Sequence, residues 1–248
     1  MAFIPEKCVN DHLLAGFDQV RIINLENRPD RRGEMVRQLE ALGGIAPNIC
    51  FHDARRPDSA GEFPSIGARG CFESHLAILR EAEKAGVDRL LIIEDDFDFT
   101  RGGLKRARAI FAGLFKQDWG FFYGAPLPAP KGHGLVEIAS DLPLLTTPFV
   151  AFRGQMLTDL RAFLEAMLQR PGGSADYGPM HVDGAYTMFR RFHPQYRTFA
   201  ACPPLGMQRS SRSDITPSNM ILDRWANTRG LAAMLRRAQN WLQGHFGS

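Results

Sequence analysis

The 248-residue sequence has few cysteines, no long apolar run and little excess of either charge. The four cysteines, at positions 8, 50, 71 and 202, include no Cys-x-x-Cys pair of the kind that forms zinc or redox sites. We therefore expect reduced, mostly buried thiols. Nowhere do about 18 apolar residues run together, so no membrane-spanning helix is expected.

Other absences narrow the classes of function. A net charge of +3 is too small to indicate a nucleic-acid partner. There is no Gly-x-Gly-x-x-Gly motif, which argues against a dinucleotide cofactor. The N-terminus lacks the charged start and apolar core of a signal peptide, so we expect a cytoplasmic protein. An ordinary hydrophobic content of 44% fits one substantial folded domain, with or without a small appendage.

An acidic cluster directly follows an apolar run. Residues 90–93 (LLII) have the composition of a buried parallel strand, and ligands of open α/β sheets bind beyond the carboxyl ends of such strands. Neighbouring carboxylates repel one another, so they require a cation, a basic side chain or water to stay ionised. A divalent metal that holds a phosphorylated ligand is one explanation. The acids are Glu94, Asp95, Asp96 and Asp98.

Apolar periodicity predicts alternating strands and helices. Strands are expected at 20–25, 48–52, 119–123 and 149–152, with another running from Leu90 into the acids; helices are expected at 29–42, 71–85, 104–115 and 155–168. The segment 54–69 is rich in Pro, Gly and Ser and should be a surface loop. This order predicts right-handed crossovers between parallel strands, hence an α/β fold with a central, mostly parallel sheet.

A basic amphipathic pattern lies at the C-terminal end of the chain. Leu231, Met234, Leu235, Ala238, Trp241 and Leu242 recur at helical spacing. We expect a domain over 1–218 and an amphipathic basic helix over 219–248. Two alternatives remain open for this helix. It either contacts the inner face of the cytoplasmic membrane as a peripheral anchor or packs on its own domain.

Segments in a fixed order resemble glycosyltransferase family 25, which includes lipopolysaccharide galactosyltransferases and collagen galactosyltransferase domains. They are 23–25 (INL) with Arg28, Asp30, Arg31 and Arg32; 52–54 (HDA); 67–75 (GARGCFESH); 93–96 (IEDD); and 182–183 (VD), with 208–215 (QRSSRSDI) beyond. The resemblance implies a Rossmann-like glycosyltransferase A-type fold and a divalent cation, Mn²⁺ or Mg²⁺. It also implies transfer of a hexose, with UDP-galactose as the leading donor. The implied acceptor is a saccharide or glycolipid of lipopolysaccharide or another surface glycan.

The resemblance also implies roles for the acids. Alternation along a strand would place Glu94, Asp96 and Asp98 on one face and Asp95 on the other. Asp96 is then the better metal ligand, with Asp98 as the second candidate. Glu94 or Asp95 would bind the ribose or the donor sugar. The metal would stabilise the departing nucleotide. The structural alternative is an acidic strand end that caps a helix or pairs with arginines.

Further donor-binding candidates follow the first expected strand. Asn24, Glu26 and Arg28 lie where nucleotides dock in Rossmann-like sheets and would contact the base and the first phosphate. We expect Arg31 and Arg32 to form a solvated first helical turn, with a bidentate phosphate contact as the alternative.

Two other groups of candidates lie farther along the chain. Arg69, Ser74 and His75 lie near a helix start, where backbone amides favour anions. For His75, the alternative is a buried histidine hydrogen-bonded in the core. Gln208 and Arg209 belong to a polar segment that could neutralise the diphosphate.

Inverting transfer requires a base that takes the proton of the acceptor hydroxyl. Asp183 is the candidate, because it follows a flexible polar segment; the alternative is helix N-capping, with Gly184 and Ala185 opening the helix. Two other functional classes remain. A sugar nucleotidyltransferase would require a Gly-rich N-terminal phosphate loop, which is absent. The other is a noncatalytic nucleotide-sugar-binding protein.

Overall fold

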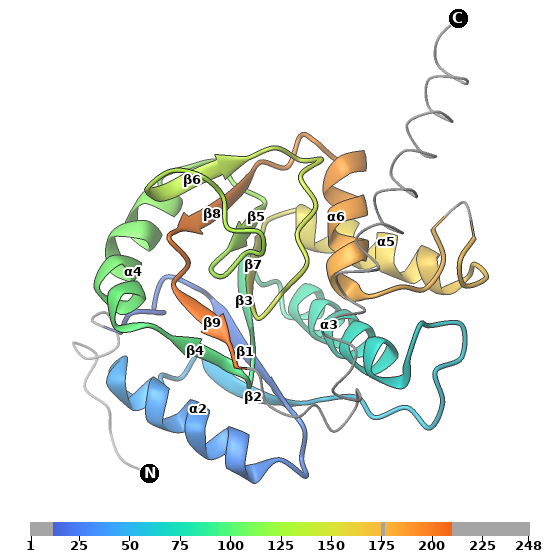
Figure 1. Ribbon diagram of the computed structural model, residues 1–248, viewed down its shortest axis with the longest axis horizontal. Helices are drawn as coiled ribbons and strands as arrows, with labels where there is room; N and C mark the ends of the chain where they lie inside the picture. The colour runs from blue at the N-terminus through green and yellow to red at the C-terminus, as the bar shows by residue number, and fades with distance from the viewer. Residues whose placement is uncertain (1–11, 175–176, 210–248) are drawn as a thin grey trace, which may run out of the picture. The chain divides into compact units, whose positions relative to one another are not determined.

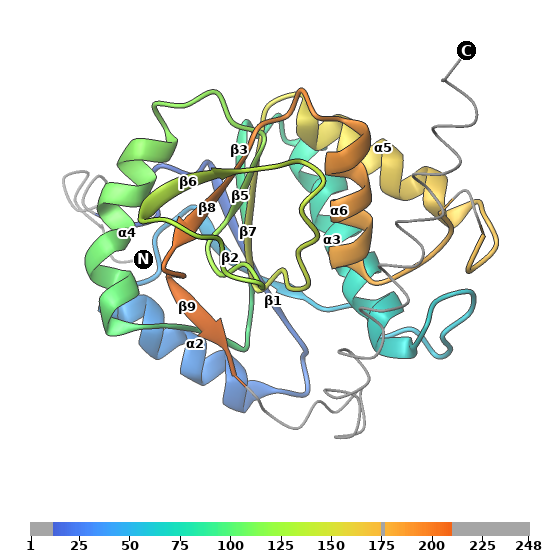
Figure 2. The same ribbon diagram turned by 45° about the horizontal axis from the view of Figure 1, so that its top comes forward.

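A seven-stranded sheet lies between two layers of helices (Figures 1 and 2). The computed structural model of the protein describes residues 12–174 and 177–209. The strand order is β2-β1-β3-β7-β5-β8-β6, and β4 pairs with β9 in a separate two-stranded sheet. The strands are β1 (Gln19–Asn24), β2 (Ile49–Asp53), β3 (Arg89–Glu94), β4 (Phe97–Phe99), β5 (Phe121–Tyr123), β6 (Gly134–Ile138), β7 (Phe149–Arg153), β8 (Thr198–Cys202) and β9 (Gly206–Gln208).

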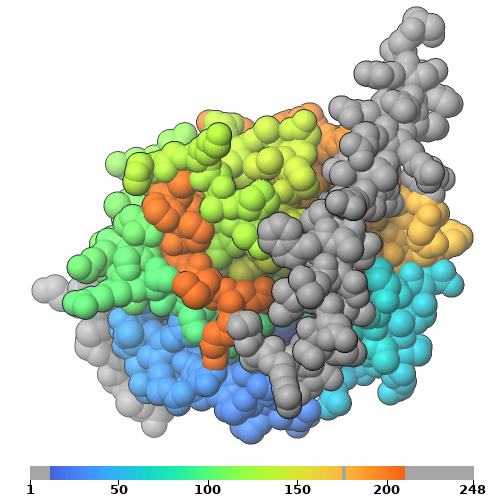
Figure 3. Space-filling model, viewed as in Figure 1, coloured from blue at the N-terminus to red at the C-terminus, as the bar shows by residue number. Residues whose placement is uncertain are grey.

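The helices cover both faces of the large sheet. They are α2 (Pro29–Ala41), α3 (Ile66–Lys84), α4 (Arg101–Leu114), α5 (Met156–Leu168) and α6 (Val182–Phe192). Helices α3, α5 and α6 lie on one side, and α2 and α4 lie on the other (Figure 1). In the space-filling view, the orange surface of β8 and β9 runs between the green of α4 and the yellow-green segment that contains β6 (Figure 3).

Strand β3 shows how the sequence produces this layering. Successive side chains of a strand point to opposite faces of its sheet. Leu90 and Ile92 pack into the core under α3, α5 and α6, whereas Leu91 and Ile93 pack into the core under α2 and α4. All four side chains are fully buried. The continuous apolar run at 90–93 is therefore explained by a strand with one core on each face.

The predicted α/β class is confirmed, and the sheet is mixed rather than mostly parallel. Strands β2, β1 and β3 are parallel, as predicted for the first hundred residues. Strand β7 runs antiparallel to both β3 and β5, and β6 runs antiparallel to β8. A parallel neighbour requires a crossover, usually through a helix. No helix is described between β5 and β7, so this part of the chain returns in the opposite direction.

The acids do not continue the buried strand. Strand β3 ends at Glu94, a turn at Asp95 and Asp96 follows, and β4 then starts the small sheet. The prediction that Glu94, Asp96 and Asp98 share one strand face is therefore wrong, because alternation holds only within an uninterrupted strand. We call residues 94–98 the acidic turn.

The structure also tests the predicted start of one helix, the burial of the cysteines and the absence of a membrane-spanning helix. Helix α3 begins at Ile66, five residues before the predicted start, with Ser65 accepting a hydrogen bond from the Ala68 amide as its cap. Of the described cysteines, Cys202 is buried, Cys71 is half-buried and Cys50 is exposed, so the expectation of burial is wrong for Cys50. No described helix is long and apolar enough to cross a membrane. The domain boundary at 218 and the helix over 219–248 lie outside the described residues.

Candidate functional site

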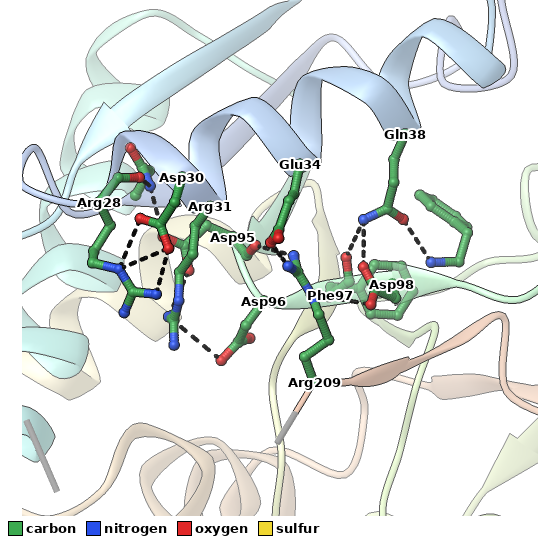
Figure 4. Close-up of polar contacts among 12 residues, drawn as sticks. Arg28, Asp30, Arg31, Glu34, Gln38, Asp95, Asp96, Phe97, Asp98 and Arg209 are labelled. Atoms are coloured by element: carbon green, nitrogen blue, oxygen red, sulfur yellow. Dashed lines mark hydrogen bonds and ion pairs between the residues drawn. The ribbon is translucent and has the colours of Figure 1, made fainter. Parts of the chain in front are cut away.

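Asp95 joins three elements at the carboxyl end of the parallel strands. Its side chain is only 8% exposed. The Asn24 amide, at the end of β1, donates a 2.7 Å hydrogen bond to its Oδ2, and Arg31 of α2 donates a 3.0 Å hydrogen bond to its Oδ1 (Figure 4). The Asp95 backbone amide also donates to the Ile23 carbonyl oxygen at 3.1 Å. Asp95 thus fixes the acidic turn against β1 and α2.

Arg31 is therefore not a solvated residue, contrary to expectation. Its side chain is 12% exposed, and its Nη1 lies 3.0 Å from Asp95 and 3.8 Å from Asp96. A buried carboxylate requires such a partner, because an unpaired charge in the interior is costly. Arg32 is exposed, as predicted, with its guanidinium 4.1 Å from the centre of the Phe51 ring.

Asp96 has one buried carboxylate oxygen without a hydrogen-bond partner. Its Oδ2 accepts a 3.2 Å hydrogen bond from Gln208, but its buried Oδ1 has no hydrogen-bond partner. Burial, and then the negative charge of Glu94, raise the pKa of Asp96 to about 7, although Gln208 and Arg31 act in the opposite direction. A buried carboxylate with an unpartnered oxygen beside a second carboxylate fits a divalent cation with oxygen ligands.

Asp98 has other partners. Its Oδ1 accepts a 2.6 Å hydrogen bond from Gln38 of α2, and its Oδ2 lies 3.0 Å from Nε of Arg209. Figure 4 shows Asp98 beside Gln38, whereas Asp96 extends toward Arg31. The structure thus does not group Asp98 with Asp96, and a metal role for Asp98 requires Gln38 or Arg209 to give up its contact.

Arg209 also holds the acidic turn. Its backbone amide donates to the Asp96 carbonyl oxygen at 2.8 Å, and its Nη2 donates to the Asp95 carbonyl oxygen at 2.9 Å. It also forms an ion pair with Glu34 of α2. Strand β9 delivers both Gln208 and Arg209 to the turn, because β9 pairs with β4. The two residues predicted from the polar C-terminal segment are therefore brought to the acids.

Glu94 faces the other layer of helices. Thr147 donates a 3.0 Å hydrogen bond to its Oε1, and Nε2 of His75 lies 3.8 Å from the same oxygen. His75 is fully buried, and its Nδ1 lies 2.8 Å from the Tyr186 hydroxyl of α6. The alternative of a buried, hydrogen-bonded histidine thus describes its position. Burial, and then the neighbouring Cys71, Tyr123 and Glu94 charges, raise the pKa of Tyr186 well above its ordinary value.

Ser74 and Arg69 hold the loop before α3. The Ser74 hydroxyl is fully buried; it donates to the Gly70 carbonyl oxygen at 2.6 Å and accepts from the Arg55 amide at 2.8 Å. A Cβ at Gly70 would lie 2.7 Å from the Arg55 carbonyl oxygen, so glycine permits this close approach. Arg69 pairs with Glu73 at 2.7 Å. The Ser74 contacts hold the backbone at Arg55 and Gly70 in place. A contact of Ser74 with a nucleotide-sugar donor stays a prediction.

Glu26 and Arg28 lie in the connection between β1 and α2. Glu26 is exposed. Arg28 donates to both oxygens of Asp30 at 2.7 to 3.2 Å, and this bond holds the pKa of Asp30 at about 2. Asn24 donates a second, 3.3 Å hydrogen bond to the Arg28 carbonyl oxygen. The predicted donor-binding residues after β1 therefore surround one connection at the edge of the acidic turn.

Asp183 occupies the first turn of α6. The helix begins at Val182 with His181 as its cap, so Asp183 is not the N-cap that the alternative required. Its Oδ1 accepts a 2.7 Å hydrogen bond from the Gly184 amide. Residues three apart share a helix face, which places Asp183 on the face that carries Tyr186 to His75. Its negative charge also contributes to the raised pKa of Tyr123, for which burial is the larger cause.

Three contact residues were not found from the sequence. Tyr186 had a usable signal, its helical spacing of three from Asp183. Gln38 is one polar residue among many on α2, and Thr147 lies in a stretch without periodicity. Their importance comes from long-range contacts that no local pattern encodes.

In this α/β protein, Asn24 and the acidic turn thus meet at the carboxyl ends of the adjacent parallel strands β1 and β3, the edge of an open α/β sheet where ligands bind. No protein-family model matches the chain. Its distant curated homologues are members of glycosyltransferase family 25.

The similar stretch covers less than half of this chain in each of these relatives. Procollagen galactosyltransferase 2 of Mus musculus is 29% identical over 134 residues, which are 44% of this chain and 20% of that protein. Procollagen galactosyltransferase 1 of Danio rerio is 31% identical over 157 residues, 49% of this chain and 25% of that protein. Inactive glycosyltransferase 25 family member 3 of Homo sapiens is 32% identical over 112 residues, 37% of this chain and 19% of that protein. The chain thus spans about a fifth to a quarter of the length of these relatives.

Solved structures show a weaker likeness. A glycosyltransferase involved in the glycosylation of the major capsid of PBCV-1 aligns with a TM-score of 0.48 and 14% identity, over 79% of this chain and 94% of that chain. A UDP-glucose pyrophosphorylase aligns with a TM-score of 0.39 and 12% identity, over 77% and 74% of the two chains.

The buried ion pair predicts a large effect of Arg31→Met on stability. Loss of the guanidinium leaves the Asp95 carboxylate buried with only Asn24 as a partner, so the free energy of unfolding should fall by about 3 kcal/mol. Urea unfolding of the full chain measures the change. Arg80→Met is the matched control, because Arg80 is 54% exposed and pairs with Glu165; that change should cost about 1 kcal/mol or less. Equal effects of the two changes would refute the buried pairing.

The raised pKa of Asp96 predicts a pH-dependent stability in the metal-free chain. Between about pH 4 and pH 7 the folded state holds a proton that the unfolded state has released, so stability is highest at low pH and falls as the pH rises. Asp96→Asn removes this dependence. The difference in unfolding free energy between wild type and Asp96→Asn should change by roughly 2 to 4 kcal/mol across that window, measured with a chelator present.

The control for this pH series is Asp58→Asn, which changes a carboxylate in the exposed loop before α3. The difference in unfolding free energy between wild type and Asp58→Asn should stay constant over the same pH window. A flat curve for Asp96→Asn as well would show that Asp96 has an ordinary affinity for protons.

Proposed function

We propose that the chain is an inverting, metal-assisted hexosyltransferase that moves a hexose from a nucleotide-sugar donor to a saccharide acceptor. The similarity to procollagen galactosyltransferases carries this proposal, because it covers nearly half of the chain. It makes galactose the leading sugar and UDP-galactose the leading donor. The proposed acceptor is a growing lipopolysaccharide or another surface glycan, on the basis of the family resemblance.

The donor half of the site is proposed at the acidic turn. Glu26 is exposed beside the end of β1, where it can contact the nucleoside. Arg28 is paired with Asp30 over one edge of its guanidinium and would turn toward the first phosphate. Asn24 and Asp95 satisfy one another, so we infer that they hold this edge in place and leave contact with the donor to their neighbours.

A divalent cation is proposed to complete the donor half. Asp96 would hold Mn²⁺ or Mg²⁺ through its unpartnered Oδ1. The negative charge of Glu94 raises the pKa of Asp96, and a cation bound at Oδ1 of Asp96 would offset that repulsion. When bound, such an ion neutralises charge on the diphosphate as the nucleotide departs. Asp98 could join only after its contact with Gln38 or Arg209 is released.

The acceptor half of the site is proposed at the start of α6. Asp183 would accept the proton of the attacking hydroxyl as the new glycosidic bond forms. Its position in the first turn suits an ionised carboxylate, because the helix dipole favours negative charge there. The Gly184 amide holds Oδ1 at 2.7 Å and so orients the carboxylate.

The test of this assignment is Asp183→Asn. The change keeps the shape and the backbone contact but removes the base, so donor binding should persist while turnover falls by roughly 100-fold or more. Release of UDP from UDP-galactose with Mn²⁺ and an acceptor extract measures turnover, and thermal shift measures donor binding. Asp118→Asn, an exposed carboxylate before β5, is the control and should keep wild-type turnover. An Asp183→Asn enzyme with near wild-type turnover would refute the base assignment.

The same assay separates the other classes of function. One relative is an inactive family 25 member. If the chain binds nucleotide sugars but releases no nucleotide diphosphate with any donor and acceptor of a panel, it is a noncatalytic binding protein. Formation of pyrophosphate from a sugar phosphate and a nucleoside triphosphate would indicate a sugar nucleotidyltransferase. Either result would replace the proposed function.

A further inference from the structure

A mixed sulfur, nitrogen and oxygen cluster lies on the Glu94 side of the acidic turn. Cys71, His75 and Glu94 each offer one ligand atom, and these atoms all lie within 4.8 Å of one another. Cys71 and His75 are four residues apart on α3 and therefore share one helix face. Glu94 reaches them from the end of β3. Two adjacent elements thus converge on one point with three different donor atoms.

The His75 ring supplies a second observation that indicates a ligand. The side chain is fully buried, yet its Nε2 has no hydrogen-bond partner and lies 3.8 Å from Oε1 of Glu94. Leaving a buried ring nitrogen without a partner costs about 1–3 kcal/mol. An ion bound between Nε2 and Glu94 would give the ring nitrogen a partner.

The contacts around the cluster are those of a supported metal site. A histidine that binds metal through one nitrogen normally hydrogen-bonds through the other, which fixes the ring and its tautomer. Nδ1 of His75 lies 2.8 Å from the Tyr186 hydroxyl; in the tautomer in which Nδ1–H donates a hydrogen bond to this oxygen, Nε2 carries the lone pair that binds a metal. Thr147 donates to Glu94 at 3.0 Å and orients that carboxylate.

We propose that Cys71, His75 and Glu94 bind a zinc ion. Zinc takes thiolate, imidazole and carboxylate ligands at about 2.0–2.3 Å in tetrahedral geometry, which puts neighbouring ligand atoms roughly 3.3–3.8 Å apart. The 3.8 Å between His75 and Glu94 fits this spacing. The fourth position would be filled by water or by an oxygen of a bound ligand.

Metal preference separates this cluster from Asp96. Thiolate and imidazole favour zinc, whereas carboxylate oxygens alone suit Mg²⁺ and Mn²⁺. The zinc site does not depend on the proposed glycosyl transfer, so either assignment can fail without the other. No Cys-x-x-Cys pair marks this cluster in the sequence, because its spacing is Cys-x-x-x-His with the third ligand 19 residues beyond His75.

The first test uses the metal alone on the full chain. Co²⁺, as a spectroscopic substitute for Zn²⁺, should give a thiolate-to-cobalt charge-transfer band that is lost in Cys71→Ser and kept in Cys50→Ser, the exposed control. In competition with a chromophoric chelator, Cys71→Ser should weaken Zn²⁺ binding by on the order of 100-fold. An unchanged band and unchanged affinity in Cys71→Ser would overturn the proposal.

Two further measurements guard against a variant that misfolds. In the wild-type chain, Zn²⁺ should slow alkylation of Cys71 but not of Cys50, as followed by peptide mass spectrometry; equal rates with and without Zn²⁺ would overturn the proposal. Tyr186→Phe keeps the ring but removes the hydrogen bond to His75, so Zn²⁺ affinity should fall by about 10–100-fold. Circular dichroism checks that each variant has kept its fold.

Discussion

The pairing of the buried Asp95 carboxylate with Asn24 and Arg31 is the interaction on which the rest of the site depends. It joins the ends of β1 and β3 to the first turn of α2. A side chain that is only 8% exposed requires these partners, because an unpaired charge in the interior is costly. Because Asp95 is fixed, Glu94 and Asp96 on either side of it are directed to different parts of the protein.

The acidic turn thereby separates two chemical environments within three residues. On one side, Glu94 meets Thr147 and His75, next to a sulfur atom and two fully buried tyrosines. On the other side, Asp96 is held by an amide and an arginine, and one of its oxygens has no hydrogen-bond partner. Zinc and Mn²⁺ or Mg²⁺ prefer different ligand atoms. The atoms on the two sides of the acidic turn differ to match the ion proposed for each side.

Local patterns in the sequence predicted the elements whose burial is periodic. The parallel β1 and β3, helix α2 and the location of the acids at a strand end follow from apolar spacing and from the rules of α/β sheets. The break at Asp95 was missed because alternation was assumed to continue through the acids. Arg31 was assigned to solvent because its partner lies 64 residues away in sequence. Local patterns do not predict strands β6, β8 and β9, because their pairing is set by long-range contacts rather than by composition.

Metal-dependent binding of UDP tests most directly whether the acidic turn is a metal and donor site. Calorimetric titration of UDP into the full chain, with and without Mn²⁺, compares wild type, Asp96→Asn and the exposed-loop variant Asp58→Asn. The account predicts that Mn²⁺ strengthens UDP binding in wild type and in Asp58→Asn, and that Asp96→Asn loses about 10-fold or more of this Mn²⁺-dependent affinity. Equal Mn²⁺-dependent affinity in wild type and Asp96→Asn would contradict it.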